Sequence, residues 1–127
     1  MVLNVKNNNI SNEKIMRNIK KELNYLGYIS KYCGTKYLEE VIYILYNNEN
    51  INNLQKEVYP IIASKYNKSV NTIKCNIITA TSIMIDDCEE RKLLKYLGYY
   101  EFSRPGPKQI AESVISKLRS KKINKLL

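Results

Sequence analysis

Lysine, asparagine, serine and threonine side chains are interleaved with apolar residues in the stretch SKYNKSVNTIKCNIITA, residues 64–80. Lysine ammonium groups and the backbone amides at the start of a helix can hold phosphate oxygens. Asparagine can pair with the edge of adenine, and threonine can bond to a base edge or touch a thymine methyl group. This combination of residue types favours contact with a nucleic-acid duplex.

The candidate contacts fall into two groups with different roles. Residues at the turn would hold phosphates and orient the protein, whereas residues on the outer face of the following helix would read bases. The apolar members of that face can touch only apolar groups such as thymine methyls, which favours an AT-rich site. The alternative is an ordinary polar helix face whose exposed isoleucine is covered by a partner protein or by a dimer contact. The first group is Lys65, Lys68 and Ser69, and the second is Asn71, Thr72, Lys74, Cys75, Ile78 and Thr79.

The charge of the chain has the sign that a polyanionic partner requires. Its 127 residues carry a formal net charge of +9, and clustered lysines gain free energy by releasing counterions from phosphates. Residues 58–85 contain lysines but no carboxylate, whereas residues 34–57 and 86–102 are net acidic. We therefore expect the acid-free stretch to approach phosphates. The basic residues of 103–127 are a second candidate for such contacts.

Catalytic and metal chemistry find little support in the composition. The chain has no histidine, so it lacks the commonest general base near neutral pH, and its three cysteines form no C-x-x-C pair. The acidic cluster DDCEE at 86–90 has the chemistry for acid/base work or for a cation site. Negative charge in the first turn of a helix is the simpler interpretation. We predict no enzymatic activity, no metal site and no cofactor.

No stretch of the sequence reaches the roughly 18 consecutive apolar residues that a membrane-spanning helix needs. The N-terminal residues MVLNVKNNNI also lack the apolar core of a signal peptide. We predict a cytoplasmic protein without a membrane partner.

Helical periodicity runs through most of the chain. Apolar residues recur at spacings of three and four, and strand-like alternation is weak. The sequence therefore predicts an all-α, compact single domain of about six helices. The apolar stripes are Ile15, Ile19, Leu23 and Leu26; Leu38, Val41, Ile42 and Leu45; Leu54, Val58, Ile61 and Ile62; Val70, Ile73, Ile77, Ala80 and Met84; and Ile110, Val114, Ile115 and Leu118.

Local start and stop signals give the expected bounds of these helices. Glycine ends helices in the left-handed conformation, proline interrupts or starts them, and serine caps them. We expect a first helix from near Ser11 or Asn12 to Gly27, a second from Thr35 to Tyr46, two short helices meeting at Pro60, a helix capped by Ser69 and running to about Ile85, a helix ending at Gly98, the loop YYEFSRPGP, and a last helix from Pro107.

Three segments follow from this division. Residues 1–11 carry consecutive asparagines and few apolar side chains, so we predict a mobile N-terminal arm. Residues 12–122 form the folded domain, and residues 123–127 form a basic C-terminal tail. Within the domain, residues 59–85 meet the requirements of a helix-turn-helix: Ala63 is small enough for a close helix contact, and Asn67 tolerates the left-handed turn.

The quoted motifs occur in the order and spacing of a known family. GTKYLEEVIYILYNN, LQKEVYPIIASKYNKSVNTIKCNI, YLGY and IAESVISKLR resemble the C-terminal DNA-binding domain of the stage 0 sporulation response regulator of endospore-forming bacteria, over roughly residues 15–120. The resemblance implies an all-helical fold that binds promoter DNA through a helix-turn-helix. It also implies a surface near residues 86–90 that approaches the RNA polymerase sigma subunit.

The sequence departs from the family pattern in the helix that reads bases. The family places an acidic residue and an arginine at the positions of Lys74 and Cys75, and an arginine and a histidine at those of Ile78 and Thr79. The phosphorylatable receiver domain that normally precedes this domain is absent from the sequence, so we expect a stand-alone relative rather than an excised effector half.

Two functions from different classes remain open. The first is a transcription regulator that binds double-stranded DNA in a sequence-specific way, with the sigma subunit and a second copy of the chain as further partners. The second is a protein-interaction module that keeps the effector fold, has lost operator binding and modulates another regulator. The departures at the base-reading positions favour the second, and the acid-free lysine stretch favours the first.

Overall fold

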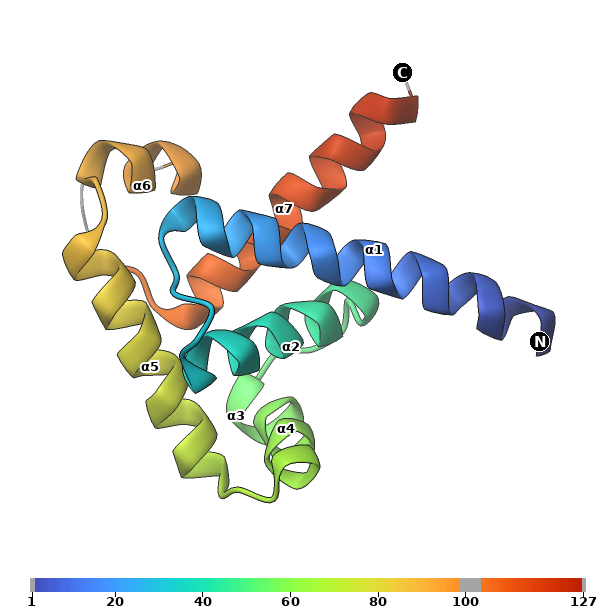
Figure 1. The fold of residues 1–127 in the computed structure, drawn as a ribbon, viewed down its shortest axis with the longest axis horizontal. Helices are drawn as coiled ribbons and strands as arrows, with labels where there is room; N and C mark the ends of the chain where they lie inside the picture. The colour runs from blue at the N-terminus through green and yellow to red at the C-terminus, as the bar shows by residue number, and fades with distance from the viewer. Residues whose placement is uncertain (1, 99–103, 127) are drawn as a thin grey trace.

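The computed structural model describes residues 2–98 and 104–126, and the side chains of residues 12–98 and 104–120. The regular secondary structure of its described residues is helical with no strand, which confirms the all-α fold. Six longer helices and one short turn of helix follow one another along the chain (Figure 1). They are α1 (Val2–Leu26), α2 (Cys33–Asn47), α3 (Leu54–Glu57), α4 (Tyr59–Tyr66), α5 (Val70–Asp87), α6 (Glu90–Leu97) and α7 (Pro107–Leu126).

Most helix ends lie where the local signals predicted them. Gly27 and Gly98 end α1 and α6 with φ of 108° and 80°, a region that a side chain disfavours. Pro60 stands in the first turn of α4, where its missing amide hydrogen costs nothing. The predicted loop over residues 99–107 is described only from residue 104 onward, so residues 99–103 lie outside the described part.

The predicted start of the first helix near Ser11 or Asn12 was wrong. The helix α1 begins at Val2, and residues 2–11 continue it. No glycine or proline occurs between Val2 and Leu26, so nothing in the backbone chemistry stops the helix. Polar asparagines lower helix propensity only modestly. A polar composition therefore does not by itself stop a helix. The mobility of the arm itself remains a prediction.

Helix α2 lies at the centre of the domain and packs against α1, α4, α5 and α7. In Figure 1 it runs below α1, with α5 crossing one end and α4 beneath it, while the far ends of α1 and α7 project from the body. Its residues Leu38, Val41 and Ile42 are fully buried. The other helices contribute the rest of the buried core, including Ile19, Leu23, Val58, Ile62, Ile73, Ile77, Met84, Leu93, Ile110 and Val114.

The contact between α2 and α5 depends on a glycine. A Cβ atom built on Gly34 would lie 2.0 Å from the backbone oxygen of Asn76 and 2.9 Å from the Cβ of Ala80. Real Cβ atoms do not approach backbone oxygens this closely, so only glycine lets the two helices cross here. Gly34 thereby sets the distance of α5 from the centre of the domain.

Two buried hydrogen bonds join helices that are distant in sequence. The hydroxyls of Tyr28 and Thr81 lie 2.8 Å apart, and the Tyr96 hydroxyl donates to Glu22 Oε1 at 2.8 Å. Burial raises the pKa of both tyrosines above the ordinary value, so both hydroxyls remain protonated. These bonds tie α5 and α6 to the C-terminal half of α1 and the residues that follow it.

Glu39 on α2 is a buried acid whose stability contribution depends on pH. Only 6% of the residue is exposed. Burial and repulsion from Glu40 raise the pKa of Glu39 above its ordinary 4.5, against the opposing attraction of Lys20 and Lys36. The folded protein therefore holds this proton more tightly than the unfolded chain does. Protonated Glu39 contributes its full stability at pH values below the pKa that it has in the unfolded chain. That contribution is lost as pH rises through the higher pKa that Glu39 has in the folded protein.

Replacing Glu39 with glutamine is expected to increase the free energy of unfolding near neutral pH, because the variant no longer ionises in a buried position. The fall in stability between acidic and neutral pH should also become shallower. Urea unfolding of both proteins from about pH 4 to about pH 7 measures this change. Glu49→Gln, at a side chain that is 79% exposed, is the control. An unchanged pH dependence in Glu39→Gln would contradict the assignment.

None of the described helices is long and apolar enough to cross a membrane.

Candidate nucleic-acid interface

Helices α4 and α5 form a hairpin around a tight turn, as a helix-turn-helix requires. Asn67 ends α4 in the left-handed conformation with φ of 54°, and the Lys68 amide donates back to Ala63 O at 2.9 Å. Ser69 begins the next helix, since its hydroxyl accepts from the Thr72 amide at 3.0 Å. Ala63 is 5% exposed, where a small residue allows α4 to pack closely. The predicted turn at Asn67, the helix cap at Ser69 and the close packing at Ala63 are confirmed.

The nine predicted contact residues all lie on α4, the turn or α5, and none of them is buried. The members on α5 recur at spacings of three and four and so share the face opposite the buried stripe of Ile73, Ile77, Ala80 and Met84. Lys65, Lys68, Ser69, Asn71, Cys75, Ile78 and Thr79 are exposed, and Thr72 and Lys74 are half-buried.

Several polar groups of the α5 face already have partners within the helix. The hydroxyls of Ser69 and Thr72 lie 2.8 Å apart, so both belong to the helix cap. The Cys75 thiol donates to Asn71 Oδ1 at 3.8 Å. These contacts are short-range and solvent-exposed, so a stronger partner can replace them at small cost. The amide group of Asn71 keeps its two N–H donors for an external acceptor.

Lys65 differs from Lys68 and Lys74 because it has an acidic partner. Its ammonium group forms an ion pair with Glu40 on α2, 25 residues earlier in the chain, and its side chain remains 61% exposed. A hydrogen bond with Glu40 and partial burial raise the pKa of the neighbouring Tyr66 to about 12. Within residues 12–98 and 104–120, no carboxylate pairs with Lys68 or Lys74.

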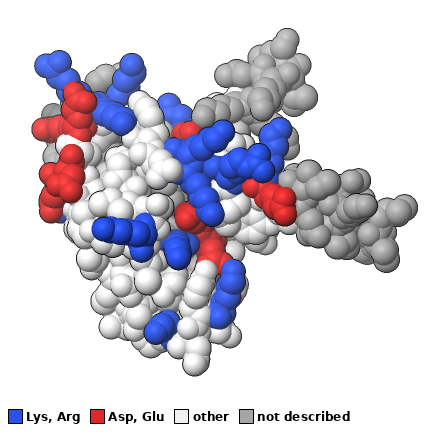
Figure 2. Space-filling view, in the orientation of Figure 1, with Lys and Arg blue, Asp and Glu red and all other residues white. Residues whose placement is uncertain are grey.

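The stretch without carboxylates in the sequence is therefore not a surface without carboxylates. Figure 2 shows basic side chains spread over the visible face, with one acidic area among them over α2 and another near the junction of α5 and α6. The prediction treated Lys65, Lys68 and Lys74 as equivalent. The fold brings an acid to one of them, and only Lys68 and Lys74 keep an uncompensated charge.

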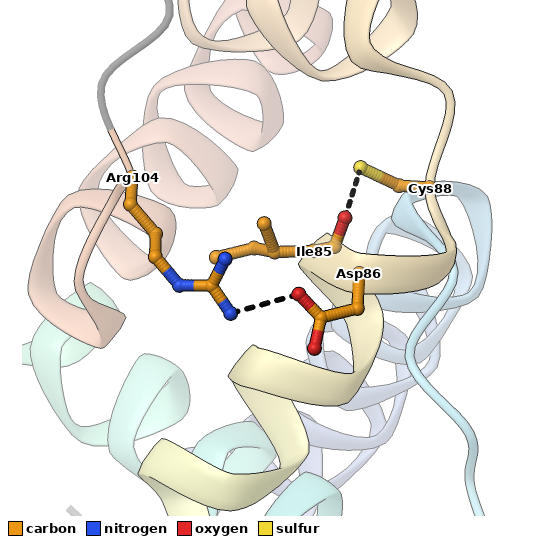
Figure 3. Close-up of polar contacts among 4 residues, drawn as sticks. All are labelled: Ile85, Asp86, Cys88 and Arg104. Atoms are coloured by element: carbon orange, nitrogen blue, oxygen red, sulfur yellow. Dashed lines mark hydrogen bonds and ion pairs between the residues drawn. The ribbon is translucent and has the colours of Figure 1, made fainter.

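The predicted role of Asp86 and Asp87 in the first turn of a helix was wrong. Both residues end α5, and the extended backbone at Cys88 stops the helix there. Asp86 instead accepts a hydrogen bond from Arg104 at 2.9 Å, and the Cys88 thiol donates to Ile85 O at 3.2 Å (Figure 3). This ion pair connects the segment before α7 to the end of α5. In the described part of the chain no group of three acidic or cysteine residues could hold a metal ion.

Ile61 was predicted to face inward with Ile62, but 56% of it is exposed. Adjacent residues of a helix point in directions about 100° apart, so a helix that packs along a narrow face buries one of the two and exposes the other. Ile62 takes that place and is 1% exposed. The exposed pair Ile61 and Ile78, the latter 42% exposed, gives the hairpin an apolar component.

Comparison with models of protein families matches residues 10–121 to the family described as sporulation initiation factor Spo0A C terminal. Comparison with individual curated proteins finds no significant match. The matched range covers all of α2 to α6 and most of α1 and α7. This family is a DNA-binding effector domain of transcription regulation and not an enzyme, which confirms the expectation from the sequence. The chain belongs to the family of the Spo0A C-terminal domain and shares its helix-turn-helix architecture.

Proposed function

We propose that this chain is a transcription regulator that binds AT-rich duplex DNA in a sequence-specific way, with α5 in the major groove. The observation that carries the proposal is the exposed face of α5 together with the turn before it, which combines polar side chains with two uncompensated lysines, Lys68 in the turn and Lys74 on α5. A helix with such a face, preceded by a tight turn, has the geometry of a recognition helix. The site lies in the cytoplasm, where promoter DNA is accessible.

The side chains divide the work according to their chemistry. Lys68 and the amides at the start of α5 that the Ser69 cap leaves without a partner would hold phosphate. Lys65 would add a weaker contact, because Glu40 offsets its charge. Bases would be read by Asn71, Thr72, Lys74 and Thr79, with Cys75 and Ile78 against thymine methyl groups.

Salt titration of duplex binding tests this function. Affinity should fall linearly in the logarithm of salt concentration, and an AT-rich genomic site should bind more tightly than a random duplex. The variant Asn71→Ala should lose about 1 to 3 kcal/mol of discrimination while keeping its salt slope, because it removes a base contact and no charge. Asn50→Ala, at an exposed residue between α2 and α3, is the control. Absence of duplex binding at low salt by the folded protein would refute the proposal.

The exposed isoleucines favour a second candidate, the protein-interaction module. Ile61 on α4 and Ile78 on α5 leave apolar surface on the hairpin that DNA phosphates do not cover. In this function the hairpin binds another regulator or a second copy of the chain. Ile61→Ser should then abolish the association in sedimentation experiments without DNA. Under the first function it should leave duplex affinity within about twofold, since Ile61 lies outside the proposed base-reading face.

A further inference from the structure

A cavity of about 580 Å³ lies between α1, α2 and α4. Its polar wall includes Thr35, Glu39 and Glu40 from α2, and its other residues include Lys20, Lys36 and Lys65. The volume is within the range of small-molecule sites, about 300 to 1,000 Å³. In Figure 2 the acidic area over α2 lies among basic side chains on this side of the molecule.

Three buried oxygen atoms in the cavity wall have no hydrogen-bond partner. They are Thr35 Oγ1, Glu39 Oε2 and Glu40 Oε2, and they are all of the buried side-chain polar atoms in the described part of the chain that lack one. Thr35 is 3% exposed and Glu39 is 6% exposed. Buried polar groups in folded proteins nearly always have partners, because an unpaired one disfavours folding. Their gathering in one cavity indicates a common partner that supplies several donors.

The charges around the cavity restrict what that partner can be. Carboxylate oxygens only accept hydrogen bonds, so the partner must carry N–H or O–H donors, and a cation suits them best. Lys20 and Lys36, however, lie close enough to Glu39 to act on its charge, and Lys65 is paired with Glu40. These ammonium groups would repel a pure cation, and the two carboxylates would repel a pure anion. A molecule that carries both a positive and a negative charge can pair with the carboxylates and with the ammonium groups of the cavity wall.

We propose that this cavity is a binding site for a free amino acid. The ligand's ammonium group donates to Thr35 Oγ1, Glu39 Oε2 and Glu40 Oε2, and its carboxylate lies between Lys20 and Lys36. The apolar residues Met16 and Leu23, which also line the cavity, face the ligand's side chain.

Binding would also act on the DNA-contacting hairpin, a step that rests on the proposed function. Glu40 Oε1 holds Lys65, and the ligand's ammonium group on Glu40 Oε2 offsets the charge of the same carboxylate, which weakens that ion pair. Lys65 then becomes available for phosphate. The amino acid would thus raise the affinity of the hairpin for DNA by releasing one positive charge.

Titration of the whole chain with pools of the common amino acids at millimolar concentration, followed by amide NMR spectra, tests the binding site. At least one amino acid should shift amides of α1, α2 and α4 around the cavity, while putrescine and acetate at equal concentration should not. Glu39→Gln, an isosteric change, should weaken binding about tenfold or more by removing a charged acceptor. The exposed Glu49→Gln should bind like the unchanged protein. If no amino acid shifts these amide signals, or if putrescine shifts them equally, the proposed binding site is wrong.

Duplex titration with and without the bound amino acid tests the coupling separately. Release of Lys65 should increase the slope of log affinity against log salt by about one, and Lys65→Ala should cancel that increase. Amino-acid binding with an unchanged slope would overturn the coupling and leave the site. Absence of DNA binding under all conditions would refute the proposed function, while the NMR result still decides whether the site exists.

Discussion

Replacing Gly34 with alanine should destabilise the domain by about 3 kcal/mol, the largest stability effect expected from a one-carbon change in this chain. The new Cβ would lie 2.0 Å from Asn76 O and 2.6 Å from Asn76 C. These are backbone atoms in the middle of α5, so no side-chain rotation can relieve the clash. The helices α2 and α5 must separate, which opens the core around Ile73 and Ile77. Urea unfolding gives the free-energy difference.

The matched control is Gly106→Ala, since a Cβ at Gly106 meets nothing within 4 Å. This residue precedes α7, and its change should cost less than about 1 kcal/mol, the order of a weakened helix cap. Equal stability of Gly34→Ala and the unchanged protein would show that α2 and α5 do not cross at this distance. The effect should reach DNA binding too, because α5 carries the proposed base-reading face on its opposite side.

The triple change of Lys65, Lys68 and Lys74 to alanine should weaken duplex binding about tenfold or more and reduce the salt slope by about 2 to 3. Each lysine that contacts a phosphate releases about one cation from the DNA on binding, so removing that lysine lowers the salt slope by about one. Among the single variants, Lys65→Ala should change the slope least, because Glu40 already offsets that charge. Loss of Lys68 and Lys74 should leave stability within about 0.5 kcal/mol, whereas loss of Lys65 should lower it, because the Glu40 side chain is only 15% exposed and loses its ion pair. Fluorescence anisotropy over a salt series measures both quantities.

A second triple variant separates local contacts from total charge. Changing Arg91, Lys95 and Lys117 to alanine also lowers the formal net charge from +9 to +6, but it acts on α6 and α7. This variant should retain most of the affinity and slope. Equal losses in the two variants would mean that overall charge attracts the duplex and that the hairpin has no special part in binding.

Local chemistry made much of the fold predictable. Pro60, Ser69 and Gly98 act through their own backbone or through residues within one turn, so their effects can be found without tertiary information. Helical periodicity likewise identified buried residues such as Ile73 and Ile77, because a helix has one period whatever it packs against. The family motifs are of the same kind, since they are read in order along the chain.

The predictions were wrong where two neighbouring residues were equally suited to burial, or where no glycine or proline marked the end of a helix. Ile61 and Ile62 are equally apolar, and only the packing of α4 decides which one is buried. Asp86 and Asp87 suit the start of one helix, yet α5 continues through them, and Arg104 supplies a partner for Asp86 from 18 residues away. Helix ends without glycine or proline depend on such tertiary partners, which propensity alone does not contain.

The sequence by itself determined the order of the helices, most of their ends, the helix-turn-helix between residues 59 and 85, and the family. Each of these depends on residues within a few positions of one another. Only the tertiary structure decided which charges and contacts the hairpin keeps: Glu40 reaches Lys65 from α2, Gly34 admits α5 against α2, and three unpaired oxygens meet in one cavity. The first two features join residues 25 or more positions apart in the sequence. The third is a cavity that residues of several helices line together. These features follow from how helices cross, a geometry that no local pattern specifies.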